Sequence, residues 1–322
     1  MKSRAISLFL LICLAFSSLV SCTQKNDNAD TSVFYSFTDS TGNEVTLAKK
    51  PEKVAVLFSS YAEIWTLSGG KVSVTVGESV ERGFADNSAV LVDSGAGHSQ
   101  IDLETLVSQK PDLVIGSSDY ECQLSAVKRC AELGIPSAAF KVETLDDYLK
   151  VLKIMCDINE NIAAYEKYGA TVESNARSII ERFVSDNSDR TIKILFIRAG
   201  SSSRSTKAKN ADNNFVCAML KELGTVNIAD TESPLLDSLS LEYILKSQPD
   251  YIFISTMGNE NAACEYVSSL FESDTWRELT AVQNGAYAFL PKDMFHYKPN
   301  ARWDTAYSYL IDLLETEFTS EN

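Results

Sequence analysis

The chain has 322 residues, 45% of them hydrophobic and 10% aromatic, and this composition predicts a folded protein with a substantial core. It carries 44 acidic and 29 basic residues, a formal net charge of −15 at pH 7. Such an acidic balance argues against nucleic acid as a partner and against charge-driven binding to an anionic lipid surface.

The N-terminus has the features of a secretion signal. Lys2 and Arg4 precede an apolar run that extends to Val20, which is short for a spanning helix and typical of a signal peptide. The run ends in Leu-Val-Ser-Cys at residues 19–22, which resembles the lipobox of bacterial lipoproteins. The resemblance implies cleavage before Cys22, acylation of its thiol, and an extracytoplasmic protein anchored to the bacterial membrane. An ordinary cleaved signal with an incidental cysteine is the alternative.

Short apolar runs bounded by turn residues predict buried strands, and longer runs with helical spacing predict helices between them. The predicted strands are 54–58, 113–116, 137–141, 192–197, 251–254 and 286–290. The predicted helices include 61–68, 102–109, 121–133, 144–156, 213–222, 241–247 and 303–317. Strands that alternate with helices indicate an α/β fold with mostly parallel sheets.

The predicted elements fall into two halves joined by a helical segment without proline. We therefore expect the following organisation: a lipoprotein signal peptide at 1–21, a lipid anchor with flexible tether and lead-in at 22–50, an N-terminal α/β lobe at 51–143, a linking helix, or two in tandem, at 144–186, and a C-terminal α/β lobe at 187–322.

An internal repeat relates the two halves. Residues 102–115 read DLETLVSQKPDLVI and residues 240–253 read SLEYILKSQPDYIF, with Leu, Glu, Pro and Asp matching at an offset of 138. Each copy predicts a short helix, stopped by a proline, and then a buried strand. Glu104 and Glu242 occupy the first helical turn, where the helix dipole alone could favour a carboxylate. The repeat predicts two similar lobes, with a ligand site between them.

Cysteine supplies little further information. Five cysteines follow Cys22, an odd number with no CxxC pair: Cys122, Cys130, Cys156, Cys217 and Cys264. This spacing predicts neither a disulfide framework nor a structural zinc site, and it leaves any pairing among the five open.

The lipobox, the paired LE…PD unit and the segment FHYKPNARWD at 295–304 together resemble the helical-backbone class of ABC-transporter substrate-binding proteins. That class serves iron–siderophore, haem and cobalamin importers. The resemblance implies two Rossmann-like lobes joined by a long helix, with a ligand cleft between the lobes. It further implies a monomer without a cofactor that docks Glu104 and Glu242 onto an ABC permease dimer with its ATPase.

Ligand contacts are expected in the loops at the carboxyl ends of the predicted strands. The candidates are aromatic, basic, imidazole and thioether side chains: Tyr61, Trp65, Tyr120, Phe295, Tyr297, Arg198, Arg204, His98, His296 and Met257. Arginines without neighbouring acids suit an anionic ligand. His98 and His296 have two possible roles: each could ligate a metal directly, or each could be an ordinary polar residue of a loop. We expect a metal chelate, with a ferric siderophore preferred over haem or a corrinoid.

Two other functional classes are weighed against transport. The sequence contains no HExxH, GxSxG, P-loop or GxGxxG motif, so it gives no support to an enzyme, although a chelatase-like enzyme shares a related two-lobed architecture. A ligand-sensing lipoprotein on the same fold is the other alternative. The lipobox and the paired glutamates favour transport.

Overall fold

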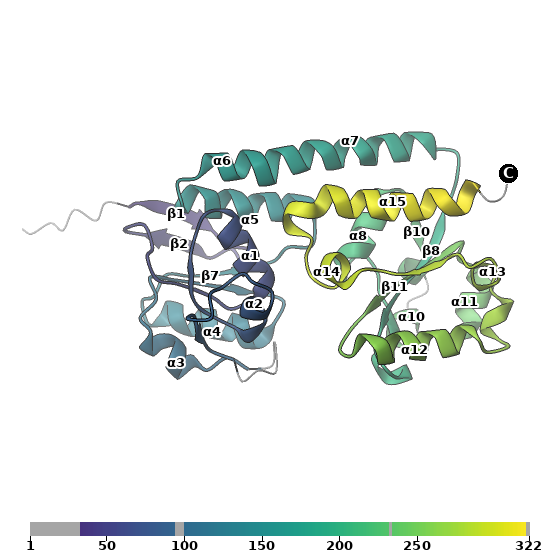
Figure 1. The fold of residues 1–322 in the computed structure, drawn as a ribbon, viewed down its shortest axis with the longest axis horizontal. Coiled ribbons are helices and arrows are strands. Elements are labelled where there is room, and N and C mark those ends of the chain that lie inside the picture. The colour runs from purple at the N-terminus through teal and green to yellow at the C-terminus, as the bar shows by residue number, and fades with distance from the viewer. Residues whose placement is uncertain (1–32, 94–99, 232–233, 320–322) are drawn as a thin grey trace, which may run out of the picture. The chain divides into compact units, whose positions relative to one another are not determined.

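The computed structural model describes residues 33–93, 100–231 and 234–319 (Figure 1). The signal peptide predicted at 1–21, the predicted lipidation site Cys22 and the candidate ligand contact His98 lie outside the described residues.

The N-terminal lobe is built on a five-stranded parallel sheet with the order β5-β4-β3-β6-β7. Its strands are β3 (Val54–Val56), β4 (Val72–Thr75), β5 (Val90–Leu91), β6 (Leu113–Ser117) and β7 (Ser137–Phe140). Its helices are α1 (Ser59–Leu67), α2 (Gly77–Glu81), α3 (Leu103–Ser108) and α4 (Glu121–Glu132). Every residue of β3, β6 and β7 is buried. This burial explains why these strands appear in the sequence as continuous apolar runs.

Helices occupy the segment predicted as the link. They are α5 (Leu145–Ile158), α6 (Ile162–Tyr165), a π-helical turn (Glu166–Ala170) and α7 (Thr171–Asp186). The α5 helix starts with a capping box between Thr144 and Asp147, which satisfies two backbone N–H groups at its N-terminus. The α7 helix runs beside α15 (Trp303–Thr319) (Figure 1), and Asn175 of α7 donates a 3.0 Å hydrogen bond to Asp304 of α15.

The C-terminal lobe has a second sheet in which the strands β10-β8-β11-β12 are parallel and β9 pairs antiparallel with β8. The strands are β8 (Lys193–Ala199), β9 (Lys207–Ala208), β10 (Val226–Asn227), β11 (Tyr251–Thr256) and β12 (Tyr287–Phe289). The helices before α15 are α8 (Phe215–Glu222), α9 (Ile228–Thr231), α10 (Pro234–Asp237), α11 (Leu241–Ser247), α12 (Glu260–Phe271), α13 (Thr280–Gln283) and α14 (Lys292–Phe295). Short 3-10 turns lie at Ser203–Ser205, Trp276–Glu278 and Asn300–Arg302. The α/β class with parallel sheets is therefore confirmed.

The sequence repeat is also a structural repeat. The helix α3 and the helix α11 begin at matching positions, and so do the strands that follow them, β6 and β11. Before the proline in each copy, Lys110 and Gln248 have positive φ angles of 51° and 45°. The next aspartate in each copy accepts a backbone hydrogen bond from the start of the neighbouring strand, at 2.9 Å from Lys53 to Asp112 and 2.7 Å from Lys193 to Asp250. The conserved geometry gives the Pro-Asp pair a structural role in both lobes.

The lead-in at 22–50 contains secondary structure that was not predicted. The lead-in contains an antiparallel hairpin of β1 (Tyr35–Thr38) and β2 (Glu44–Leu47), whose Phe37, Val45 and Leu47 are buried in the core. In β1 and β2 buried and exposed residues alternate, which is the pattern of strands with one face in solvent. Alternation over four residues is a weaker signal for predicting a strand than a continuous apolar run.

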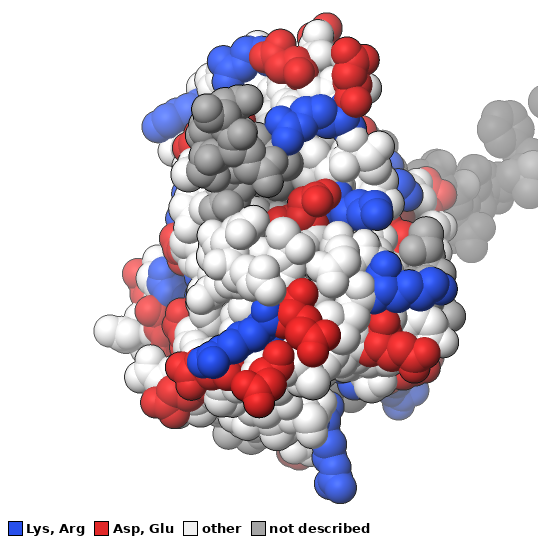
Figure 2. All heavy atoms as spheres, turned by 90° about the vertical axis from the view of Figure 1, so that its right-hand side faces the viewer, with Lys and Arg blue, Asp and Glu red and all other residues white. Residues whose placement is uncertain are grey.

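The surface and the cysteines agree with a folded, acidic protein. Acidic and basic side chains are interspersed on the face shown in Figure 2. All five cysteines that follow the tether are free thiols, and Cys130, Cys156 and Cys217 are buried. Within the described ranges no helix is both long and apolar enough to cross a membrane.

Candidate ligand-binding site

Residues at the carboxyl ends of both sheets come within electrostatic range of one another. Tyr120 follows β6 in the N-terminal lobe, and Arg198 lies near the end of β8 in the C-terminal lobe. Burial raises the pKa of Tyr120, and the positive charge of Arg198 opposes that rise. Because the two residues belong to different lobes, the strand ends of the two lobes face a common region, which is where open α/β sheets place their ligands.

The segment after α14 crosses from one lobe to the other. The ammonium group of Lys298 lies 2.8 Å from a carboxylate oxygen of Glu143, which follows β7. The side-chain amide of Asn300 donates to the Ser60 carbonyl at 2.9 Å and to the Glu63 carboxylate at 2.8 Å. Asn300 is fully buried and has a φ of 50°, a conformation that asparagine tolerates better than most residues. These bonds fix the position of this segment against α1.

Arg82 stands at the centre of a polar cluster at the end of α2. Its guanidinium donates to the Ser59 hydroxyl at 2.9 Å and lies 3.7 Å from the Glu63 carboxylate. It also lies over the ring of Tyr297, 3.9 Å from the ring centroid. Burial raises the pKa of Glu63, while the hydrogen bond from Asn300 and the charge of Arg82 oppose the rise. The cation therefore links α1 and α2 to the Tyr297 ring across the lobe boundary.

His296 is a neutral imidazole at neutral pH. Burial lowers its pKa to about 4, and the positive charges of Arg198 and Lys292 contribute to the shift. Its ring makes an edge contact with the Tyr297 ring, with centroids 5.0 Å apart. A neutral imidazole retains a nitrogen lone pair, but within the described part of the chain no three His, Cys, Asp or Glu side chains form a metal-binding group.

The two arginines predicted as ligand contacts have different surroundings. Arg198 on β8 pairs in the sheet with Lys207 on β9, and both charges, together with burial, lower the pKa of Lys209. Arg198 is half-buried and forms no ion pair with any residue that the structure describes. Arg204 is exposed on the 3-10 turn. Arg198 is thus the arginine whose charge acts on Tyr120 of the other lobe and that has no acid partner among the described residues.

Three of the predicted ligand contacts belong to the core instead. Tyr61, Trp65 and Phe295 have at most 1% of their surfaces exposed. The Tyr61 hydroxyl donates to the Phe140 carbonyl at 2.9 Å, and the Trp65 indole nitrogen donates to the Lys71 carbonyl at 3.1 Å. The polar atoms of Tyr61 and Trp65 are therefore satisfied inside the N-terminal lobe, and the burial of all three side chains argues against their direct contact with a ligand.

The remaining aromatic and thioether candidates keep some exposure. Tyr120, Tyr297 and Met257 are each half-buried. The Tyr120 ring packs against Phe58, with centroids 5.4 Å apart, and the Met257 backbone continues β11 by donating to the Ala199 carbonyl at 2.9 Å.

Several polar residues of this region were not predicted from the sequence, chiefly Glu78, Arg82, Lys298 and Asn300. Lys298 and Asn300 belong to the segment FHYKPNARWD, on which part of the family resemblance rests, but the resemblance gives neither residue a role. Glu78 and Arg82 lie on or next to α2, a helix of five residues whose sequence has no helical periodicity to reveal it.

Glu104 and Glu242 lie in equivalent positions of the structural repeat. Each is exposed in the first turn of its helix, α3 or α11. Neither carboxylate forms an ion pair with a described residue. The aspartate Asp102, not Glu104, caps α3 by accepting from the Thr105 backbone at 3.0 Å. Capping therefore does not require the glutamate in that copy, and its carboxylate is available to another molecule.

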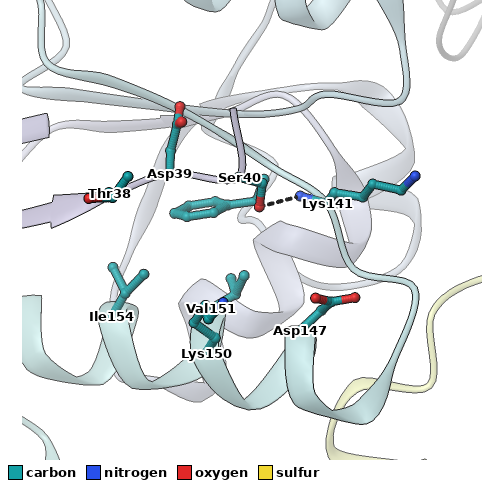
Figure 3. A pocket seen from close by; sticks show the side chains of 9 residues that line it. Thr38, Asp39, Ser40, Lys141, Asp147, Lys150, Val151 and Ile154 are labelled. Atoms are coloured by element: carbon teal, nitrogen blue, oxygen red, sulfur yellow. Dashed lines mark hydrogen bonds between the residues drawn. The ribbon is translucent and has the colours of Figure 1, made fainter. Parts of the chain in front are cut away.

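A pocket of about 240 Å³ lies elsewhere, between the turn after β1 and the helix α5 (Figure 3). Its carboxylates serve the fold: Asp39 accepts from the backbone of Asn43 and Ala139, and Asp147 belongs to the cap of α5. The Lys141 side chain points away from the pocket in Figure 3. Both carboxylates that line this pocket are therefore engaged in the fold.

Comparison with known proteins fits this architecture. Residues 54–294 match the family described as "Periplasmic binding protein", and the chain belongs to that family. An uncharacterized ABC transporter substrate-binding lipoprotein of Bacillus subtilis, YvrC, is 26% identical over 295 residues, which cover 88% of each chain.

Solved structures share the fold at lower identity. The vitamin B12 binding protein BtuF of Vibrio cholerae has a TM-score of 0.65 and 19% identity, with 83% of this chain and 98% of that one covered. The catecholate-siderophore binding protein VctP of Vibrio cholerae has a TM-score of 0.66 and 16% identity, with 88% of this chain and 99% of that one covered.

Proposed function

We propose that the protein is the substrate-binding component of an ABC importer. It works outside the cytoplasm, held to the bacterial membrane by a lipid on Cys22, as a monomer with no catalytic role. Membership of the periplasmic binding protein family supports a binding function. The name of the Bacillus subtilis relative supports both the transporter and the lipid anchor.

The ligand we propose is a metal chelate with anionic groups, a ferric siderophore before haem or a corrinoid. The observation that carries this proposal is the half-buried Arg198, which has no acid partner in the described ranges and whose charge acts on Tyr120 of the other lobe. A partly desolvated cation without an acid partner is stabilised more by an anionic ligand than a solvated or paired cation is. Tyr120 and Tyr297 supply aromatic surface against the chelate.

In this mechanism the ligand binds between the lobes and contacts both. The bonds of Lys298 and Asn300 to the N-terminal lobe, together with the helical link, restrict the relative motion of the lobes. The loaded protein then docks onto the permease through Glu104 and Glu242, and the ligand passes to the transport pathway.

The absorption spectrum of the protein purified with its native ligand tests the ligand class. A ferric charge-transfer band is expected, whereas a Soret band would indicate haem and a corrinoid spectrum would indicate cobalamin. The same preparation of Arg198→Ala should carry less ligand, and Arg182→Ala, an exposed arginine on α7, is the matched control. A protein that carries none of the three chromophores, and binds none when they are added, would contradict the proposal.

A further inference from the structure

Most charged side chains around the candidate site have partners of opposite sign. In the N-terminal lobe, Arg82 pairs with Glu63 at 3.7 Å and Lys141 pairs with Asp119 at 3.8 Å. Glu143 pairs with Lys298 across the lobe boundary. These pairs hold the two lobes and their loops together, and their charges are largely neutralised within the protein.

Glu78, on α2, differs from these acids. Its carboxylate accepts a hydrogen bond from the Ser59 hydroxyl, which in turn accepts from Arg82 at 2.9 Å. Within the described ranges, Glu78 forms no direct ion pair with a lysine or an arginine. The carboxylate is half-buried, so it is partly desolvated without a cation in contact with it.

Glu78 also lies within range of the candidate ligand residues of both lobes. Its negative charge contributes to the raised pKa values of Tyr120 and Tyr297, and it opposes the lowering of the pKa of His296. Tyr120 belongs to the N-terminal lobe, whereas His296 and Tyr297 follow α14 of the C-terminal lobe. The hydrogen bonds give the same placement: Glu78 accepts from Ser59, and the Arg82 guanidinium that donates to Ser59 lies 3.9 Å from the centroid of the Tyr297 ring. The carboxylate therefore lies close to a candidate ligand residue of the C-terminal lobe.

The chemistry of a carboxylate limits what can bind beside it. An ionised carboxylate only accepts hydrogen bonds, through about four lone-pair positions. A ligand that presented only anionic groups to Glu78 would be repelled and would add no donor to the one that the Ser59 hydroxyl supplies, so the remaining lone pairs of the carboxylate would stay unsatisfied. A ligand with an N–H donor or an ammonium group there would satisfy it. The cation that suits anionic groups, Arg198, lies in the other lobe.

We propose that Glu78 determines specificity in this site by accepting a hydrogen bond from an N–H or ammonium group of the ligand, while Arg198 binds an anionic group of the same ligand. The ligand then carries both kinds of group and binds in one orientation, with its donor toward α2 and its anionic group toward β8. This inference rests on the proposed function, because it concerns the same site.

Four probes in two classes test the proposal. Ferrioxamine B, with a free ammonium group, and cyanocobalamin, with amide N–H groups and a phosphodiester, carry donors. Ferric citrate and haemin present carboxylates without N–H groups on their periphery. Affinities are measured for the wild type, for Glu78→Gln and for the control Glu44→Gln. Glu44 also accepts a serine hydroxyl, from Ser36 at 3.2 Å, but lies on the hairpin strand β2.

The proposal predicts that the wild type binds at least one donor-bearing probe, and that Glu78→Gln weakens it about tenfold or more, the range of a charge-assisted hydrogen bond. Binding of the donor-free probes should stay equal or improve, and Glu44→Gln should change neither class. Equal loss in both classes, or an unchanged donor-bearing probe, would overturn the assignment of Glu78. If the wild type bound none of the four, the proposed function itself would be contradicted, and the inference with it. Circular dichroism and thermal melting confirm that both variants are folded.

Discussion

The Lys298 ammonium lies 2.8 Å from the Glu143 carboxylate, joining residues 155 positions apart in the chain and on different lobes. Their side chains are only 12% and 24% exposed, so both charges are largely removed from water. The Lys298 ammonium also lies over the Phe215 ring, 4.7 Å from its centroid. A pair in such surroundings contributes to the stability of the fold chiefly because neither of its two desolvated charges is left unpaired.

Breaking this pair should therefore lower the free energy of unfolding more than the loss of a surface ion pair does. Lys298→Met is expected to lower the free energy of unfolding by about 1–3 kcal/mol, because Glu143 would remain desolvated without its cation. Urea unfolding measures the change. Combining Lys298→Met with Glu143→Gln should cost less than the sum of the two single changes. Additive losses would mean that the two charges do not interact in solution.

The Asp112 carboxylate should make stability depend on pH in the acid range. Hydrogen bonds from the backbone of Lys53 and Glu52 lower its pKa below the ordinary value of about 3.9. A lowered pKa gives stability that is present above the ordinary value and lost as the pH falls through the folded-state value. The stability difference between the wild type and Asp112→Asn should thus be about 1 kcal/mol at pH 7 and shrink below pH 4. The exposed Asp86→Asn serves as control, and a difference that did not vary with pH would contradict the prediction.

His296 should titrate far below an ordinary histidine. Its pKa of about 4 predicts a neutral ring at pH 7, and the folded state should lose stability as the pH falls from about 6.5 toward 4, because the unfolded chain binds a proton that the folded chain does not. Nuclear magnetic resonance can follow the imidazole, and His296→Gln assigns its signals in a chain with two histidines. An anionic ligand on Arg198 should raise this pKa. A midpoint near 6.5 in the free protein would contradict the burial of the ring.

Arg198 and Arg204, both predicted as ligand contacts, should differ in their effect on ligand affinity. Arg198→Ala should weaken an anionic ligand by about 1.5–3 kcal/mol, the range of a charge-assisted hydrogen bond. Arg204 is exposed on the 3-10 turn, where solvent screens its charge, so Arg204→Ala should cost about 1 kcal/mol or less. Titration calorimetry with the native ligand measures both. A larger loss for Arg204→Ala than for Arg198→Ala would reverse the assignment.

The central strands and the repeat were predictable because they have strong local signals. Strands such as β6 and β11 are buried along their whole length, so their residues form unbroken apolar runs, and the Pro-Asp pairs mark where they begin. The strand β4 was missed because Val72-Ser73-Val74-Thr75 mixes apolar and polar residues.

The site was less predictable because its contacts are tertiary. No spacing in the sequence indicates that Asn300 reaches Glu63, 237 positions earlier. The helix α1 is instructive: Tyr61 and Trp65 are four residues apart and therefore share one face, which is the buried one. Glu63, between them, lies on another side of the helix and belongs to the interlobe contacts.

The paired glutamates test the transport function most directly. Glu104→Arg combined with Glu242→Arg is compared with Glu121→Arg combined with Glu260→Arg in proteoliposomes that contain the permease and its ATPase. Glu121 and Glu260 are exposed acids in the first turns of α4 and α12, so both double variants lose the same favourable interaction with a helix dipole, about 0.3–1 kcal/mol per site. Reversal at Glu104 and Glu242 should abolish ligand uptake and stimulated ATP hydrolysis with ligand affinity unchanged, while the control pair should transport normally. Full uptake by the Glu104 and Glu242 variant would contradict the docking role.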